Sequence, residues 1–246
     1  MQIIPALYIK DGKAASYVPG DYLNMQFLAQ DPYEIIDMLG RYDVQRIHLV
    51  DIDASLDSEV RNTGLIGSLA NVSIPNLEVA GGIADMDHIK SLQYAGVDYW
   101  VLGTAVFEDM DLLREIAHAD HIPNDRVMIS FDIIDGVIAS HGWTRIVALQ
   151  DITELIGQIQ EIGFQRVIVT RIDTQNPGSG PDLAFYEQLV AHFPQITFTA
   201  SGHIRSFEDI DALRAVGVHE VIVGNEIYQD ETLLARISAY NEAEGA

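Results

Sequence analysis

The chain has 246 residues, 48% of them hydrophobic, so it can bury a sizeable core in one α/β barrel or in two small domains. Its formal net charge of −23 disfavours nucleic acids and anionic membranes as partners, and the absence of cysteine excludes disulfides and thiolate metal sites. No apolar run is long enough to span a membrane, and the N-terminus has no signal-peptide pattern, so we expect a cytoplasmic protein.

Short apolar runs rich in β-branched residues alternate with amphipathic stretches along the chain. Eight of these runs are typical of parallel strands covered on both faces: 3–9, 46–52, 76–79, 99–102, 126–133, 166–172, 196–200 and 220–223. Helices are predicted between them, and several starts carry a residue suited to capping the helix N-terminus: Asp31, Asp85, Asp109, Asp151, Asp182, Ser206 and Asp230.

The two halves of the chain repeat each other. A shift of 121 residues aligns Gly81 with Gly202, and a shift of 124 aligns Asp11-Gly12 with Asp135-Gly136. Eight strand–helix units in two equivalent halves predict a single (β/α)₈ TIM-barrel domain over residues 1–246, with half-barrels of about 1–122 and 123–246. The alternative is a doubly wound open sheet, which the repeat disfavours.

Glycine-rich loops follow four of the predicted strands, two in each half. Ligands of such barrels lie at the C-terminal strand ends, where glycines let backbone N–H groups approach an anion. The duplication predicts two phosphate sites on opposite sides of the mouth, and therefore a ligand phosphorylated at both ends. The alternative is that each glycine only turns a strand into its helix. The loop residues are Gly81, Gly82, Gly103, Thr104, Ser201, Gly202, Gly224 and Asn225.

The centre of the mouth is also duplicated, because the repeat places Tyr8 on Asp132. Asp132 stands among apolar residues, where burial would raise the pKa of the carboxyl and suit it to acid or base catalysis. It could instead cap a loop. Thr170 either binds the reacting group or is an ordinary strand residue, and Asp51 either binds ribose hydroxyls or holds loop backbone.

Several motifs follow one another in an order and spacing that resemble a known family. They are Ile4-Pro5-Ala6, Gly20-Asp21-Tyr22, the run from His48 to Asp53, Gly81-Gly82-Ile83, Gly142-Trp143 and Ser179-Gly180-Pro181. Over essentially its whole length the chain resembles the ProFAR isomerase (HisA) family of histidine biosynthesis. The resemblance implies a duplicated TIM barrel that converts an aminoaldose ribose phosphate into an aminoketose by an Amadori rearrangement, without a metal or organic cofactor.

The resemblance also implies roles for individual residues. Asp132 matches the family's general acid, Thr170 matches its strand-six threonine, and Trp143 matches the tryptophan that covers the aromatic base of the substrate. The glycine loops match the phosphate loops of the family.

Other positions depart from the family pattern. Tyr8 stands where the family has its aspartate base, and a phenol with a reference pKa near 10 is a poor base at neutral pH. An arginine of the first phosphate loop is replaced by Ala84. Arg171, Arg205 and His203 are new positive or potentially positive groups at the mouth, although the sequence slightly favours His203 as a loop histidine bonded to backbone.

Two functions follow from these observations. The first is a divergent isomerase acting on a small phosphorylated substrate, with Asp132 as acid and Tyr8 or an unidentified group as base. The second is a relative that binds a phosphorylated ligand without isomerase activity. We expect a monomer. We also expect no metal site, because the histidines lack ligand spacing with one another. The acidic composition reflects either solubility or adaptation to salt.

Overall fold

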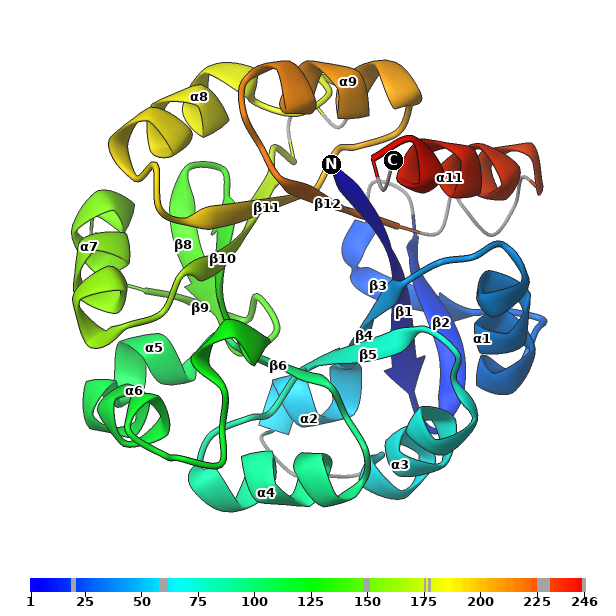
Figure 1. Cartoon of the computed structure of the whole chain (residues 1–246), viewed down its shortest axis with the longest axis horizontal. Coiled ribbons are helices and arrows are strands. Elements are labelled where there is room, and N and C mark those ends of the chain that lie inside the picture. Colours follow the sequence, from blue (N-terminus) through cyan, green and yellow to red (C-terminus); the bar gives the residue numbers. More distant parts are fainter. Residues whose placement is uncertain are drawn as a thin grey trace.

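The strands of the protein close into a barrel with helices around its outside (Figure 1). The computed structural model describes residues 1–246 except 19–20, 58–61, 148–150, 175, 177, 225–230 and 245–246. Eight parallel strands of this described part form the barrel wall, and the last pairing, between β10 and β7, closes it. In spatial order they are β1 (Gln2–Lys10), β4 (Arg46–Asp51), β5 (Asn76–Ala80), β6 (Tyr99–Leu102), β7 (Val127–Ile134), β10 (Arg166–Ile172), β11 (Thr197–Ser201) and β12 (Glu220–Val223).

The eight predicted strands are therefore confirmed as the barrel wall, and the open-sheet alternative is wrong. Alternate residues of each strand face opposite sides of the wall. In β1, Ile3, Leu7 and Ile9 belong to the large core between strands and helices, whereas Ile4 and Ala6 belong to a smaller cluster inside the barrel. Because both faces are covered, these strands read as continuous apolar runs in the sequence.

Helices follow the strands and form the outer ring in Figure 1. None of the described helices is long and apolar enough to cross a membrane. Their bounds are α1 (Pro32–Arg41), α2 (Ile52–Asp57), α3 (Thr63–Val72), α4 (Met86–Tyr94), α5 (Ala105–Glu108), α6 (Met110–Ala117), α7 (Ile152–Ile162), α8 (Leu183–His192), α9 (Phe207–Ala215) and α11 (Glu231–Glu244), with a 3₁₀ turn η1 (Asn124–Arg126).

The predicted N-caps are confirmed wherever the structure describes them. Each of these side chains accepts a hydrogen bond from a backbone N–H of the first helical turn, and Asp31 and Ser206 complete capping boxes with Glu34 and Asp209. Asp230 lies outside the described residues. The confirmed caps are Asp31, Asp85, Asp109, Asp151, Asp182 and Ser206.

Two antiparallel extensions rise from the mouth of the barrel, and neither was predicted from the sequence. β2 (Lys13–Val18) and β3 (Asp21–Phe27) continue β1, while β8 (Val137–Ser140) and β9 (Arg145–Ile146) continue β7. Both begin at an Asp-Gly turn with positive φ at each residue, 49° and 70° at Asp11-Gly12 and 50° and 83° at Asp135-Gly136. This conformation suits a tight hairpin, and the Asp-Gly pair was its signal in the sequence.

The interior of the barrel is filled in layers. The cluster of Ile4, Ala6, Val101, Met128, Ile168 and Ile222 forms an apolar plug below the mouth. At the N-terminal strand ends lies a buried charged network, in which Arg46 contacts Glu78 and Glu220, and Arg166 also contacts Glu220. The plug and the network fill the described barrel below the mouth, and the cavity lies above them.

Candidate functional site

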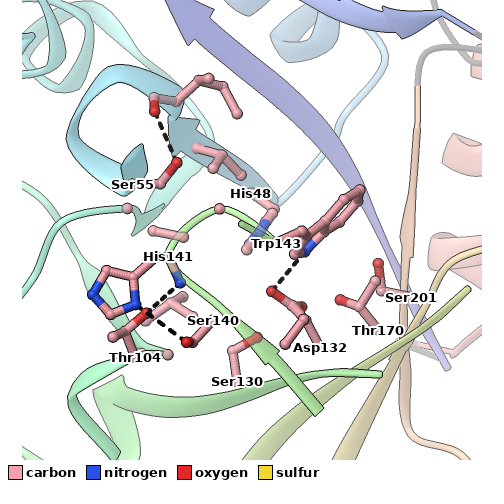
Figure 2. A pocket seen from close by; sticks show the side chains of 18 of the residues that line it. His48, Ser55, Thr104, Ser130, Asp132, Ser140, His141, Trp143, Thr170 and Ser201 are labelled. Atoms are coloured by element: carbon pink, nitrogen blue, oxygen red, sulfur yellow. Dashed lines mark hydrogen bonds between the residues drawn. The ribbon is translucent and has the colours of Figure 1, made fainter. Parts of the chain in front are cut away.

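A cavity of about 580 Å³ occupies the mouth of the barrel, at the C-terminal ends of the strands. Figure 2 shows polar side chains from opposite walls converging on it. Most of the residues singled out in the sequence line this one space: Tyr8, Gly81, Gly82, Gly103, Thr104, Asp132, Trp143, Thr170, Ser201, Gly202, His203, Arg205 and Gly224.

Asp132 projects from β7 into the centre of the cavity. The Trp143 Nε1–H donates a hydrogen bond to its Oδ2 atom at 2.9 Å, and the hydroxyl of Thr170, its partner on β10, also bonds to the carboxyl. Enclosure by protein raises the pKa of Asp132, and the two hydrogen bonds and the nearby His48 ring offset the rise only in part. A carboxyl that holds its proton above the usual range of aspartate is suited to act as a general acid.

The two hairpins meet over the mouth through their aromatic side chains. Tyr17 from β2 stacks on Trp143 from the loop after β8, with ring centroids 5.2 Å apart and planes 13° apart. Tyr8 meets the same Tyr17 ring edge-on at 5.1 Å. Burial raises the pKa of Tyr17, so its phenol stays neutral. Tyr17 was missed in the sequence, because its position depends on a hairpin that was not predicted.

The first glycine of each duplicated loop packs against the neighbouring strand. A Cβ on Gly81 would lie 2.2 Å from the carbonyl oxygen of Asp51, and a Cβ on Gly202 would lie 2.3 Å from that of Arg171. Both glycines also have positive φ, 102° and 88°. The turn therefore requires glycine on its own account. The same loops line the cavity, and their binding of phosphate stays a prediction.

The two phosphate-loop ends of the cavity differ in charge. At the second-half end, the exposed Arg205 lines the cavity, and His203 Nε2 accepts a hydrogen bond from the Asp173 backbone N–H at 2.9 Å. This is the geometry of a loop histidine bonded to backbone. At the first-half end, the Thr104 hydroxyl accepts a hydrogen bond from the His141 backbone N–H at 3.0 Å. Among the described residues that line the cavity, the first-half end has Ala84 and no arginine, whereas Arg205 stands at the other end.

Two predicted substrate contacts lie away from the cavity. Arg171 bonds to Asp182 at 2.8 Å, because odd positions of β10 face the helices while Thr170 faces inward. Asp51 accepts hydrogen bonds from the Ala54 backbone at 3.0 Å and from the Asn62 side chain at 2.8 Å, which is the loop-holding alternative. Burial raises the pKa of Asp51, and these bonds oppose the rise. Asn225 lies outside the described residues.

Comparison with known proteins fits this arrangement. The family model described as histidine biosynthesis protein matches residues 2–232. The chain belongs to this family.

Relatives within the histidine biosynthesis family cover nearly the whole chain. One from Streptococcus thermophilus is 30% identical over 240 residues, covering 98% of this chain and 99% of its own. One from Dehalococcoides mccartyi is 34% identical over 236 residues, covering 96% and 98%, and one from Clostridioides difficile is 30% identical over 229 residues, covering 93% of each. Each is named as a phosphoribosyl imidazole-4-carboxamide isomerase, the enzyme abbreviated ProFAR isomerase.

One residue of this histidine biosynthesis protein was missed although it lines the cavity. His48 projects inward from β4, and its Nδ1 atom lies 2.6 Å from Oε1 of the fully buried Glu78. The sequence contained one signal for it: His48 alternates with Arg46 and Val50 along one predicted strand, so these three side chains share a face. No cluster of three or more potential ligands that could hold a metal ion occurs among the described side chains.

Proposed function

We propose that this protein is an isomerase of histidine biosynthesis that converts the aminoaldose ProFAR into its aminoketose. The observation that carries the proposal is the carboxyl of Asp132, with a raised pKa, at the centre of a mouth bounded by two duplicated glycine loops. The names of the relatives support the same reaction.

The chemistry begins with a proton transfer from Asp132. The acid protonates the ring oxygen of the ribose, the bond between that oxygen and C1 breaks, and the nitrogen lone pair forms an iminium with C1. Removal of the proton on C2 then gives an enaminol, which becomes the ketone when C1 is protonated. The Thr170 hydroxyl, bonded to the same carboxyl, keeps Asp132 oriented toward the ring oxygen.

Binding of the substrate uses the two ends of the cavity. Backbone N–H groups of the loops at Gly81-Gly82 and Ser201-Gly202 supply donors for the two phosphates. Arg205 adds a positive charge at the second-half end, which local binding requires because the net charge of the chain is −23. The aromatic rings of Trp143 and Tyr17 offer the imidazole carboxamide a flat apolar surface.

The test is turnover of ProFAR by the purified protein. We expect isomerisation by the natural chain and a loss of about 10²- to 10⁴-fold in kcat for Asp132→Asn, the range of general acid catalysis. Asp120→Asn, an exposed aspartate outside the cavity, is the matched control and should match the natural chain. Turnover that survives Asp132→Asn would rule out this mechanism, and its absence in the natural chain would rule out the activity.

The second candidate is a relative that binds the bisphosphate without turning it over. Tyr8 at the position of the family's base favours it, because a neutral phenol does not remove a proton from carbon at pH 7. Calorimetry with ProFAR separates the candidates: heat of binding with no product formed supports the second, and product formation supports the first.

We also propose that the protein acts as a monomer in the cytoplasm without a cofactor. The high negative charge supports the monomer, since copies of the chain repel each other. Sedimentation velocity at micromolar concentration should give one species of 27.2 kDa, and a concentration-dependent dimer would contradict it.

A further inference from the structure

The reaction needs a base at C2 as well as the acid at the ring oxygen. In the closed strand order, β1 lies across the barrel from β7, and β4 lies across from β10. Asp132 and Thr170 stand on β7 and β10, so a base that reaches C2 from the other side belongs to β1 or β4. The inward residues near the mouth on those strands are Tyr8, His48 and Val50.

His48 is the side chain among these that carries a ring nitrogen able to accept a proton. Glu78 is 0% exposed, His48 is 11% exposed, and their contact of 2.6 Å fixes the ring between the buried carboxylate and the cavity. Arg46 Nε, 3.3 Å from the second Glu78 oxygen, holds that carboxylate in place. With Nδ1–H donated to Glu78, Nε2 carries the lone pair, and within the described part of the chain it bonds to no other residue.

We propose that His48, oriented by Glu78, is the catalytic base that removes the C2 proton in this chain, in place of the aspartate that Tyr8 replaces. The inference rests on the proposed function. His48 Nε2 takes the proton from C2, and the C–H electrons form the C1–C2 double bond while the iminium nitrogen regains its lone pair. The imidazolium then returns its proton to C1 as the C2 hydroxyl gives its proton to the Asp132 carboxylate, so both groups recover their starting states.

The surroundings of His48 agree with this role. The buried Glu78 carboxylate balances the positive charge that the ring acquires when it takes the proton. A positive ring also favours the ionised carboxylate of Asp132, which is the form left after the acid has given up its proton. The two groups therefore face one space and support each other through the reaction.

The decisive experiment compares substitutions at His48 and Tyr8 with ProFAR carrying deuterium at C2. His48→Gln should lower kcat by about 10²- to 10⁴-fold while KM stays within a few-fold, and the isotope effect on kcat should rise as proton removal becomes rate-limiting. Tyr8→Phe should cost far less in kcat. The matched control is His121→Gln, an exposed histidine outside the cavity, with kcat equal to the natural chain.

Rescue separates a base from a structural residue. His48→Ala opens space for imidazole in the cavity, and we expect added imidazole to restore turnover in proportion to its concentration, whereas it should not restore Asp132→Asn. Nitrogen-15 NMR of the natural chain should show His48 with hydrogen on Nδ1. Hydrogen on Nε2, or full activity of His48→Gln, would overturn the proposal.

The outcomes distinguish this inference from the proposed function. Turnover that survives His48→Gln but is abolished by Tyr8→Phe removes the histidine base and leaves the isomerase intact. No turnover by the natural chain removes the isomerase, and the base with it.

Discussion

The Asp132 carboxyl is subject to opposing influences from its neighbours. Enclosure raises its pKa, while the hydrogen bonds from Trp143 and Thr170 lower it, as does the charge of the His48 ring when that ring is protonated. The net rise means that kcat should fall as pH increases through the raised pKa of Asp132, because the acid then loses its proton. By lowering the pKa of Asp132, the hydrogen bond from the indole makes the carboxyl a stronger acid. The same bond narrows the pH range over which the carboxyl keeps its proton.

Replacing Trp143 with phenylalanine isolates that bond. The phenyl ring keeps an aromatic surface against Tyr17 but has no N–H for Asp132, so the pKa of the carboxyl rises further and the alkaline limb of kcat moves to higher pH. A fall in kcat of less than about tenfold should accompany the shift, the size of one lost hydrogen bond. The measurement is the pH profile of kcat, and an unmoved limb would show that the indole does not act on Asp132.

The positions of some site residues could be predicted from the sequence, and the positions of others could not. Asp132 and Thr170 could be placed because each ends a predicted strand, and the two prove to be partners in register. The contact between His48 and Glu78 could not, since it joins residues on neighbouring strands and depends on their register and on the ring's orientation. Arg171 was misplaced for the related reason that a shift of one position reverses the face of a strand.

Among the elements, the loops after β5 and β11 preserve the internal repeat in their backbone. Gly81 lies against the Asp51 carbonyl and Gly202 against the Arg171 carbonyl, and these pairs correspond between the halves. Gly202→Ala should destabilise the fold by about 2–3 kcal/mol, because Cβ would overlap a backbone oxygen and positive φ is strained for alanine.

The matched control for that substitution lies in a helix. A Cβ on Gly157, inside α7, would meet no neighbouring atom within 4 Å, and this glycine has no positive φ. Gly157→Ala should therefore stabilise the protein by about 0.5–1 kcal/mol. Urea denaturation measures both free energies of unfolding. Equal effects of the two alanines would contradict the close packing of the Gly202 loop.

At the same scale, the strands and helix starts were predictable because their signals are local. Apolar runs mark the buried strands, and Asp31 and Ser206 mark helix starts through their own hydrogen bonds. The hairpin of β8 and β9 was missed because its strands are only four and two residues long and carry no clear alternation. Their only local signal, an Asp-Gly pair, is common in loops of every kind.

For the whole molecule, the charged network under the apolar plug ties five strands of the barrel together: β4, β5, β10, β11 and β12. Glu220 on β12 binds Arg46 on β4 and Arg166 on β10, each at 2.6 Å, and Thr199 on β11 at 2.8 Å. Burial acts to raise the pKa of Glu220, but the two arginines and Thr199 together hold it below its ordinary value. This network was not predicted, because its members are far apart in the sequence.

Stability at low pH follows from that lowered pKa. The contribution of Glu220 is fully present above the ordinary value of 4.5 and is lost as pH falls through its lower value in the folded protein. Glu220→Gln should cost about 3–5 kcal/mol at pH 7, because it leaves buried arginines without their partner. The cost should shrink in acid. Urea denaturation across this pH range measures it against Glu161→Gln, an exposed control; a cost independent of pH would contradict the account.

The net charge of −23 acts on the molecule as a whole, and salt should therefore stabilise it. Repulsion among surface carboxylates disfavours the compact state, and ions screen it over a Debye length of about 10 Å at 0.1 M and about 3 Å at 1 M. We expect the unfolding temperature to rise steeply as NaCl increases to about 0.2 M, where most of the repulsion between distant charges is screened. A rise that stops there supports the solubility interpretation, whereas a continued rise to about 1 M supports adaptation to salt. Equal stability in dilute buffer and in molar salt would show that the acidic surface does not oppose folding.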